Sequence, residues 1–186
     1  GKIRAYNVDG TAIVNELYPF DTGDQIWGSL ASADINLDGV TDFVVGSKDK
    51  SLYFFDENGY NGSYDTGSFL ISTPVIGDID DDPELEVLIG GYSGGDGRKI
   101  FALNHDQTPV DGFPIDIGEK IKKGISLADF NDNGKDDMVF GTDNNNIYLI
   151  YDDGSVADGF PYQTGGKIHS SPSILDVDGD LVILAG

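Results

Sequence analysis

The sequence contains no cysteine among its 186 residues, so neither a disulfide framework nor thiol chemistry is available to it. Basic residues are scarce as well, because 11 lysines and arginines face 33 aspartates and glutamates and leave a formal net charge of −22. This excess of negative charge argues against nucleic acid and against an anionic membrane surface as partners. No run of apolar residues is long enough to span a bilayer, so we expect no membrane insertion.

The acidic residues are concentrated in four short motifs, which hold 16 of the 33 carboxylates. We call these motifs loop 1 (residues 34–42), loop 2 (78–86), loop 3 (129–137) and the fourth motif (176–180). Each has Asp or Asn at positions 1, 3 and 5, and the three loops add an acid at position 9. Oxygen-bearing side chains at this spacing in a tight turn suit a hard cation such as Ca²⁺. The alternatives are acidity that only keeps the surface soluble, and Asx turns that need no metal.

The same motifs mark a structural repeat. Their first aspartates are 44, 51 and 47 residues apart. Twelve residues after the first aspartate, three copies have a glycine, namely Gly46, Gly90 and Gly141. A period of about 40–50 residues with several short strands per unit is typical of the blades of a β-propeller.

Each unit divides into four predicted strands. Strand A leads into the acidic loop, and strand B leaves it as an unbroken apolar run at 43–45, 87–89 and 138–140. Such runs predict strands that are covered on both faces. Strand C is an aromatic and aliphatic segment, and we expect strand D to hold the Gly-Phe-Pro copies at 112–114 and 159–161, because proline suits an edge strand.

The predicted fold is all-β: a β-propeller of four-stranded antiparallel blades in a single region, 1–186. We expect the C and D strands of a first blade, three whole blades, and the A and B strands of a last blade. The corresponding residues are 1–23, 24–67, 68–118, 119–165 and 166–186. Either the half blades pair to close a small ring, or the chain is a slice of a larger propeller. We favour the slice, because rings with more blades are commoner.

These motifs resemble the FG-GAP/VCBS repeat family of calcium-loop β-propellers, which includes integrin α-subunit heads and many bacterial secreted proteins. The resemblance covers essentially the whole chain, and its specific part is the acidic loop between strands A and B. Trp27-Gly28 stands where the family has Phe-Gly, but Gly46-Ser47-Lys48 replaces the family's Gly-Ala-Pro, which resembles the bacterial-type branch. Because such loops fill reliably only at millimolar-range calcium, we expect an extracellular or cell-surface location.

The expected Ca²⁺ ligands are the side chains at positions 1, 3, 5 and 9 and the backbone carbonyl at position 7, completed by water. An EF-hand would need an acid at position 12, where this chain has Val45, Ile89 and Phe140. Zinc is disfavoured, because it prefers nitrogen and sulfur ligands. The predicted ligands are Asp34, Asn36, Asp38, Val40 and Asp42 in loop 1, Asp78, Asp80, Asp82, Glu84 and Glu86 in loop 2, Asp129, Asn131, Asn133, Lys135 and Asp137 in loop 3, and Asp176, Asp178 and Asp180 in the fourth motif.

The four copies are expected to differ. Loop 1 is the cleanest, with three carboxylates and a turn glycine, Gly39. Loop 2 has four carboxylates, but Pro83 replaces the turn glycine and must close the loop differently, because proline holds φ near about −65°. Loop 3 has only two carboxylates among its ligands and should bind most weakly. The fourth motif is short and lacks a position-9 acid, so we expect a broken site.

A second candidate site lies where strand A begins, on the face opposite the loops. Trp27, the only tryptophan, gathers there with Lys122, Lys123 and His169, and we expect a protein or glycan ligand at this face. The alternative is that Trp27 fills space between blades and the lysines are merely solvated. No Ser-His-Asp or Cys-His set can be assembled, which favours a binding, adhesion or scaffold module. A polysaccharide lyase or hydrolase is the alternative function.

Overall fold

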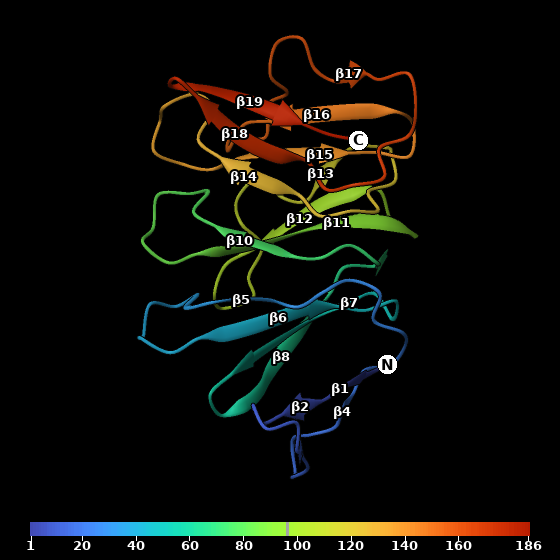
Figure 1. Ribbon diagram of the computed structural model, residues 1–186, viewed down its shortest axis with the longest axis vertical. Helices are drawn as coiled ribbons and strands as arrows, with labels where there is room; N and C mark the ends of the chain where they lie inside the picture. Colours follow the sequence, from blue (N-terminus) through green and yellow to red (C-terminus); the bar gives the residue numbers. More distant parts are fainter. Residues whose placement is uncertain (96) are drawn as a thin grey trace.

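The computed structural model describes residues 1–95 and 97–186, and the regular structure within these ranges is all β-strand. The strands form antiparallel sheets that are stacked on one another along the longest dimension of the molecule (Figure 1). The predicted all-β class is therefore confirmed. No helix in the described ranges is long and apolar enough to cross a membrane.

Three sheets form the middle of the stack, and their strands follow the order of the sequence. The strands are β5 (Ala31–Ala33), β6 (Asp42–Gly46), β7 (Ser51–Asp56), β8 (Gly59–Asp65), β9 (Ser68–Leu70), β10 (Val75–Gly77), β11 (Glu86–Gly94), β12 (Lys99–Leu103), β13 (Ile115–Asp116), β14 (Ser126–Ala128), β15 (Asp137–Gly141), β16 (Asn146–Ile150) and β17 (Tyr162–Gln163). Two sheets have the orders β5-β6-β7-β8 and β14-β15-β16-β17, and the one between them has the order β10-β11-β12-β13. Strand β9 pairs with the C-terminal part of β11.

The two ends of the chain form smaller, separate sheets. Their strands are β1 (Lys2–Ile3), β2 (Ala5–Tyr6), β3 (Ala12–Ile13), β4 (Phe20–Asp21), β18 (Ser173–Val177) and β19 (Asp180–Leu184). Strand β1 pairs with β4, β2 with β3, and β18 with β19. The first and last sheets lie at opposite ends of the stack (Figure 1), so the described residues form an open stack and not the small closed ring.

The second strand of each middle sheet is buried on both faces, as the unbroken apolar runs predict. In β11, Val87 and Ile89 pack with Val44 of the preceding sheet, whereas Leu88 packs with Met138 of the following one. All these side chains are fully buried. Burying an apolar side chain of this size stabilises the fold by about 1.5–3 kcal/mol. The main hydrophobic clusters therefore lie between successive sheets.

The repeated glycines lie where the next sheet comes closest. A Cβ atom at Gly90 would be 2.3 Å from Ile121 Cγ2, and one at Gly141 would be 2.4 Å from Ile168 Cγ2. Gly46 is crowded in the same way by side chains of the following sheet. None of the three has a φ in the left-handed region, so the absence of a side chain serves the close approach of two sheets and not a turn.

The substitution Gly90→Ala is expected to destabilise the protein by about 1–3 kcal/mol, because the added methyl group must displace Ile121 from a packed interface. For a chain of this length, that corresponds to a fall in melting temperature of roughly 2–12 °C, measured by circular dichroism. Gly165→Ala is the matched control, since no atom lies within 4 Å of a Cβ placed there. Equal melting temperatures for the two variants would contradict this reading of the repeated glycines.

The prediction for strand D was wrong by a few residues. The two Gly-Phe-Pro segments lie in turns, and the strands begin only after them, at Ile115 and Tyr162. Gly112 and Gly159 have φ values of +85° and +86°, far from the extended backbone of a regular strand. The proline that follows also lacks the N–H that a strand ladder uses. These segments therefore precede strand D and are not part of it.

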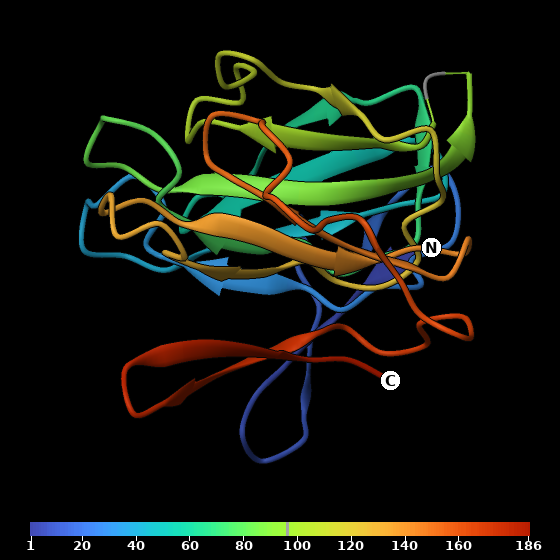
Figure 2. The same ribbon diagram turned by 90° about the horizontal axis from the view of Figure 1, so that it is seen from above.

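The acidic motifs all lie along one side of the stack. The connections β5–β6, β10–β11, β14–β15 and β18–β19 emerge on the same side in Figure 1, and Figure 2 shows the same grouping in the view from above. Strands β5, β10, β14 and β18 contact one another in succession. The segments that lead into these strands therefore gather on the other side of the molecule.

Candidate metal centres and the lysine–aromatic cavity

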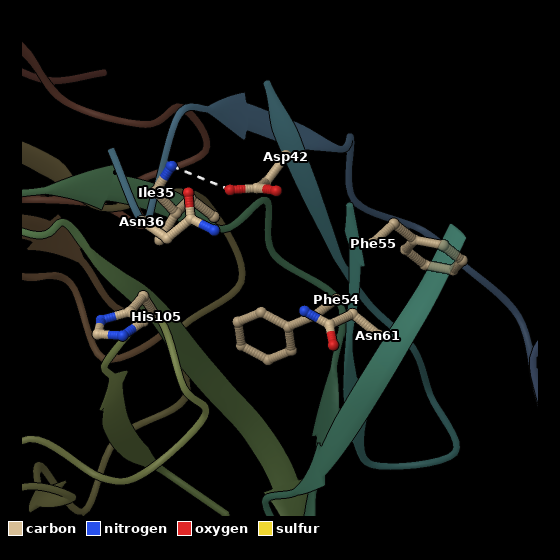
Figure 3. A pocket seen from close by; sticks show the side chains of 7 residues that line it. All are labelled: Ile35, Asn36, Asp42, Phe54, Phe55, Asn61 and His105. Atoms are coloured by element: carbon tan, nitrogen blue, oxygen red, sulfur yellow. Dashed lines mark hydrogen bonds between the residues drawn. The ribbon is translucent and has the colours of Figure 1, made fainter. Parts of the chain in front are cut away.

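The position-9 acid of each loop is the first residue of the strand that leaves the loop. Asp42, Glu86 and Asp137 begin β6, β11 and β15, and their exposed fractions are 8%, 0% and 0%. One oxygen of each accepts a hydrogen bond from the backbone N–H of position 2, at 3.1, 2.9 and 2.7 Å. Figure 3 shows this bond in loop 1, where Ile35 donates to Asp42. The bond joins the two ends of each loop.

Positions 3 and 5 close the turns through local hydrogen bonds. Asn36 Oδ1 accepts the Asp38 N–H at 3.1 Å, and Asp38 Oδ1 accepts the Val40 N–H at 2.8 Å. The corresponding bonds in loops 2 and 3 measure 2.8–3.1 Å. These are Asx turns, so the Asp and Asn residues at positions 3 and 5 have a local structural role whether or not an ion is bound.

Positions 1 and 9 provide a feature that Asx turns do not explain. Among the described residues, four buried side-chain oxygens have no hydrogen-bond partner: Asp34 Oδ1, Asp78 Oδ1 and Glu86 Oε1 in the loops, and Asn104 Oδ1 outside them. Burying a polar group without a partner costs roughly 1–3 kcal/mol, and more when the group is charged. A cation bound by oxygen ligands removes that cost, so the residues present fit Ca²⁺.

Loop 2 concentrates these features. One oxygen each of Asp80, Asp82 and Glu86 lie within 4.8 Å of one another. Burial raises the pKa of Glu86 to about 7, with a further contribution from neighbouring carboxylates and an opposing one from its backbone hydrogen bond. Burial is also the main cause that raises the pKa values of Asp42 and Asp137. Ionising the position-9 carboxylates therefore costs free energy unless a cation is bound beside them.

The backbone of loop 2 follows a different path from that of loops 1 and 3. Positions 4 and 6 have positive φ in loop 1, 57° at Leu37 and 92° at Gly39. The same positions have 58° at Asp132 and 91° at Gly134 in loop 3. Every residue of loop 2 is described, and none has positive φ. Pro83 therefore closes its loop differently, as proline requires.

Loop 3 uses more of its carboxylate oxygens internally. Asp129 accepts the N–H groups of Asn133 and Gly134 at 3.0 and 2.7 Å. Asp137 accepts the N–H of Asp152 at 3.0 Å in addition to that of position 2. Loop 3 therefore has fewer oxygens left for an ion than loop 2.

Loops 2 and 3 are joined by residues that the sequence patterns did not reveal. The Asp136 N–H donates to the Asp78 carbonyl at 2.7 Å, and Asp136 Oδ2 accepts the Asp78 N–H at 3.2 Å. Lys135 Nζ lies 2.8 Å from Asp81 Oδ1 and 3.7 Å from Asp152 Oδ2. The side chain of Lys135 thus connects two neighbouring candidate sites, a role separate from that predicted for its carbonyl.

The fourth motif forms a tight hairpin. Val177 pairs with Asp180 across a turn of Asp178 and Gly179, whose φ values of 57° and 93° are typical of a two-residue type I′ turn. The side chains of two paired residues lie on the same face of a sheet, so Asp180 shares a face with Val177. Side chains of neighbouring residues in a strand point to opposite faces, so Asp176 lies on the other face. The structure therefore does not bring Asp176 and Asp180 together.

A small cavity adjoins loop 1 and is shown in Figure 3. It has a volume of about 20 Å³ and is lined by Ile35, Asn36, Asp42, Phe54, Phe55, Asn61 and His105. A cavity of this size has room for one water molecule. His105 belongs to the loop side of the stack, whereas His169 precedes β18 on the other side, so the two histidines do not form one site.

On that other side, three of the four predicted ligand residues meet. We use the name lysine–aromatic cavity for a space of about 320 Å³ that is lined by Trp27, Ile71, Tyr92, Lys122 and Lys123. Trp27 is 63% exposed. Lys122 Nζ lies 3.0 Å from Asp143 Oδ2, and this contact raises the pKa of Lys122. His169 does not line the cavity, and its backbone N–H donates to the carbonyl of Gly186.

No protein-family model and no curated protein matches the chain. Many solved structures are similar to it in fold, including the following three. BBS1N in complex with ARL6DN has a TM-score of 0.63 and 12% identity, covering 87% of this chain and 47% of that one. BamB from Moraxella catarrhalis has a TM-score of 0.53 and 15% identity, with coverages of 80% and 41%. The C-terminal domain of PilY1 from Pseudomonas aeruginosa has a TM-score of 0.53 and 18% identity, with coverages of 77% and 35%.

The chain spans less than half the length of each of these three structures. At identities this low, the likeness concerns the fold alone. The stacked antiparallel sheets and these similarities together show that the chain has a β-propeller-like, all-β fold.

Proposed function

We propose that the chain is part of a calcium-stabilised β-propeller of the FG-GAP/VCBS type that acts outside the cell as a binding, adhesion or scaffold module for a protein or glycan. The observation that carries the proposal is the set of buried oxygens without partners at position 1 of loops 1 and 2 and at position 9 of loop 2. The calcium is structural, because the candidate ligands hold the A–B connections together and lie on the side away from the lysine–aromatic cavity.

Each loop would hold Ca²⁺ through the side chains at positions 1, 3, 5 and 9 and the carbonyl at position 7. When bound, the ion supplies positive charge against which the buried position-9 acid can ionise. Oxygen-only ligand sets of this kind suit Ca²⁺ and not zinc. Sites on extracellular modules typically bind calcium with Kd values of about 10⁻⁴–10⁻³ M, which favours a location outside the cell.

In the proposed architecture, each middle sheet is one blade, and the end sheets are half blades of a larger propeller. The similarity to longer propeller-like structures supports this arrangement. A protein partner is supported by the similar BBS1N structure, which was solved in complex with ARL6DN. The enzyme alternative has less support, because Lys122 is ion-paired with Asp143 and the acidic loops lie on the other side of the stack.

Calcium counting by equilibrium dialysis at about 5 mM calcium tests the proposal, and we expect two or three ions per chain. Asp38→Ala, at position 5 of loop 1, should remove one ion. Asp180→Ala is the matched control, because it makes the same change at position 5 of the fourth motif, where the hairpin separates the acids. No bound calcium, or an equal loss in both variants, would defeat the assignment of the loops.

A further inference from the structure

We propose that the lysine–aromatic cavity binds an acidic oligosaccharide, one whose sugars carry carboxylate or sulfate groups. This inference rests on the proposed function, since it names the ligand class of the binding module. Three successive sheets build the cavity: Trp27, Ile71 and Lys122 each stand seven residues before the first aspartate of the acidic loop that follows. The structural repeat therefore brings equivalent positions to one place.

Positive charge gathers at this cavity on a chain whose net charge is −22. The lysines around it are Lys48, Lys120, Lys122 and Lys123. Lys48 Nζ lies 4.5 Å from the ring centroid of Trp27, and Lys120 Nζ lies 4.9 Å from that of Tyr92. Among residues 1–95 and 97–186, Asp143 is the one carboxylate that pairs with any of these four lysines. Among the described residues, three of these four lysines have no carboxylate at ion-pair distance, which favours an anionic ligand.

The aromatic rings also restrict the shape of the ligand that the cavity can bind. Trp27 is 63% exposed, although tryptophan is highly buried on average, and Tyr92 and Ile71 extend its apolar surface. The wall therefore matches a ligand that carries a flat apolar face and a negative charge on the same small unit. A uronate or a sulfated sugar has both, because the C–H groups of its ring face can lie on an aromatic ring while the anion meets a lysine. The side chains of Asp and Glu carry the anion without such a face, so an acidic peptide matches this wall less well.

The size of the cavity sets the length of the bound segment. Its volume of about 320 Å³ is at the lower end of the range of roughly 300–1,000 Å³ for small-ligand sites. A short stretch of an oligosaccharide fits this space, and the exposure of Trp27 allows a longer chain to continue across the surface.

Trp27 is the only tryptophan of the chain, so its fluorescence reports on the lysine–aromatic cavity. The experiment titrates the calcium-loaded protein with a hyaluronan oligosaccharide, which carries a uronate on every second sugar, and follows tryptophan fluorescence. We expect a saturable change that weakens as salt is added. A chitooligosaccharide of equal length, which is neutral, should give no saturable change.

Lys123→Ala is expected to weaken hyaluronan binding by about tenfold, because a charge-assisted contact is lost. Lys2→Ala removes the same charge from the first sheet and is the matched control. Trp27→Ala, followed by calorimetry, should also weaken binding. Unchanged melting temperatures of the variants would show that each remains folded.

Four results would overturn the inference: no fluorescence change with hyaluronan, equal binding of the neutral oligosaccharide, an equal loss of affinity in Lys2→Ala, or tighter binding of oligoglutamate. The last result would point to an acidic protein instead. A calcium-dependent rise in melting temperature without hyaluronan binding would overturn only the ligand assignment. Absence of that rise would instead defeat the calcium part of the proposed function.

Discussion

Removing calcium with excess EDTA is expected to lower the melting temperature of the protein by about 10–20 °C. An ion that binds only the folded chain adds about 2.7 kcal/mol per loop when its concentration is a hundred times Kd, which is about 10 mM calcium for a Kd of about 10⁻⁴ M. Two filled loops then add about 5 kcal/mol, and each kcal/mol corresponds to roughly 2–4 °C for a chain of this length. Loops 1 and 2 should carry most of the effect, because they hold the buried oxygens without partners.

Circular dichroism melts in calcium, in EDTA and in magnesium measure this effect. Magnesium is the control, because it demands near-octahedral geometry and gives up its water reluctantly, so it should restore little stability. The melting temperature should also rise steadily with calcium concentration, as binding linkage requires. Identical melts in calcium and in EDTA would rule out a structural role for the ion.

The substitution Glu86→Gln is expected to change stability in opposite directions with and without calcium. Burial raises the pKa of Glu86 to about 7. Keeping this group ionised in the calcium-free protein at about pH 8 therefore costs up to about 3 kcal/mol, which glutamine avoids. Glutamine also keeps an oxygen for the Ile79 N–H, which donates to Glu86 at 2.9 Å. With calcium present, the variant loses a charged ligand, so calcium stabilises it less.

The pH dependence of the calcium-free protein provides the measurement. The pKa of Glu86 in the folded chain lies above its ordinary value of 4.5, so the folded chain holds the proton more tightly than the unfolded chain. The resulting stability is fully present below about pH 4.5 and is lost as the pH rises through about 7. Asp42 and Asp137 act in the same direction, because burial raises their pKa values too. Melts of Glu86→Gln over this range should show a flatter dependence.

Glu84→Gln is the matched control for this substitution. Glu84 lies two residues earlier in loop 2 and is expected to contribute only its backbone carbonyl. Its variant should therefore keep nearly the full stabilisation by calcium. If Glu86→Gln destabilised the calcium-free protein, the buried charge would not be costly, and the physical argument for a cation at this residue would fail.

The features that could be predicted from the sequence depend on residues close together in the chain. The apolar run at 87–89 predicts a strand buried on both faces, and the structure confirms this. The absence of a positive φ at position 6 of loop 2 follows from Pro83. The Asp178-Gly179 hairpin could also have been predicted, since Asp-Gly favours a two-residue turn.

What could not be predicted concerns contacts between units. The hydrogen bonds between Asp136 and Asp78 join residues from different sheets, and a repeat pattern does not say which loops touch. Tyr92 enters the lysine–aromatic cavity because β11, at nine residues, extends past Gly90. Asp152 was missed because it lies two residues after the end of β16, and only the folded chain brings its N–H to Asp137 of loop 3.

The placement of the hydrophobic clusters between sheets has a consequence for how the molecule comes apart. No middle sheet encloses a core of its own, so none is expected to persist once both neighbours are gone. Stability then becomes a sum of nearest-neighbour interfaces along a row, as in solenoid proteins. Mechanical load applied along the stack would open these interfaces one after another. A ligand held by Trp27, Ile71 and Lys122 would bridge three sheets and resist that separation at two interfaces together.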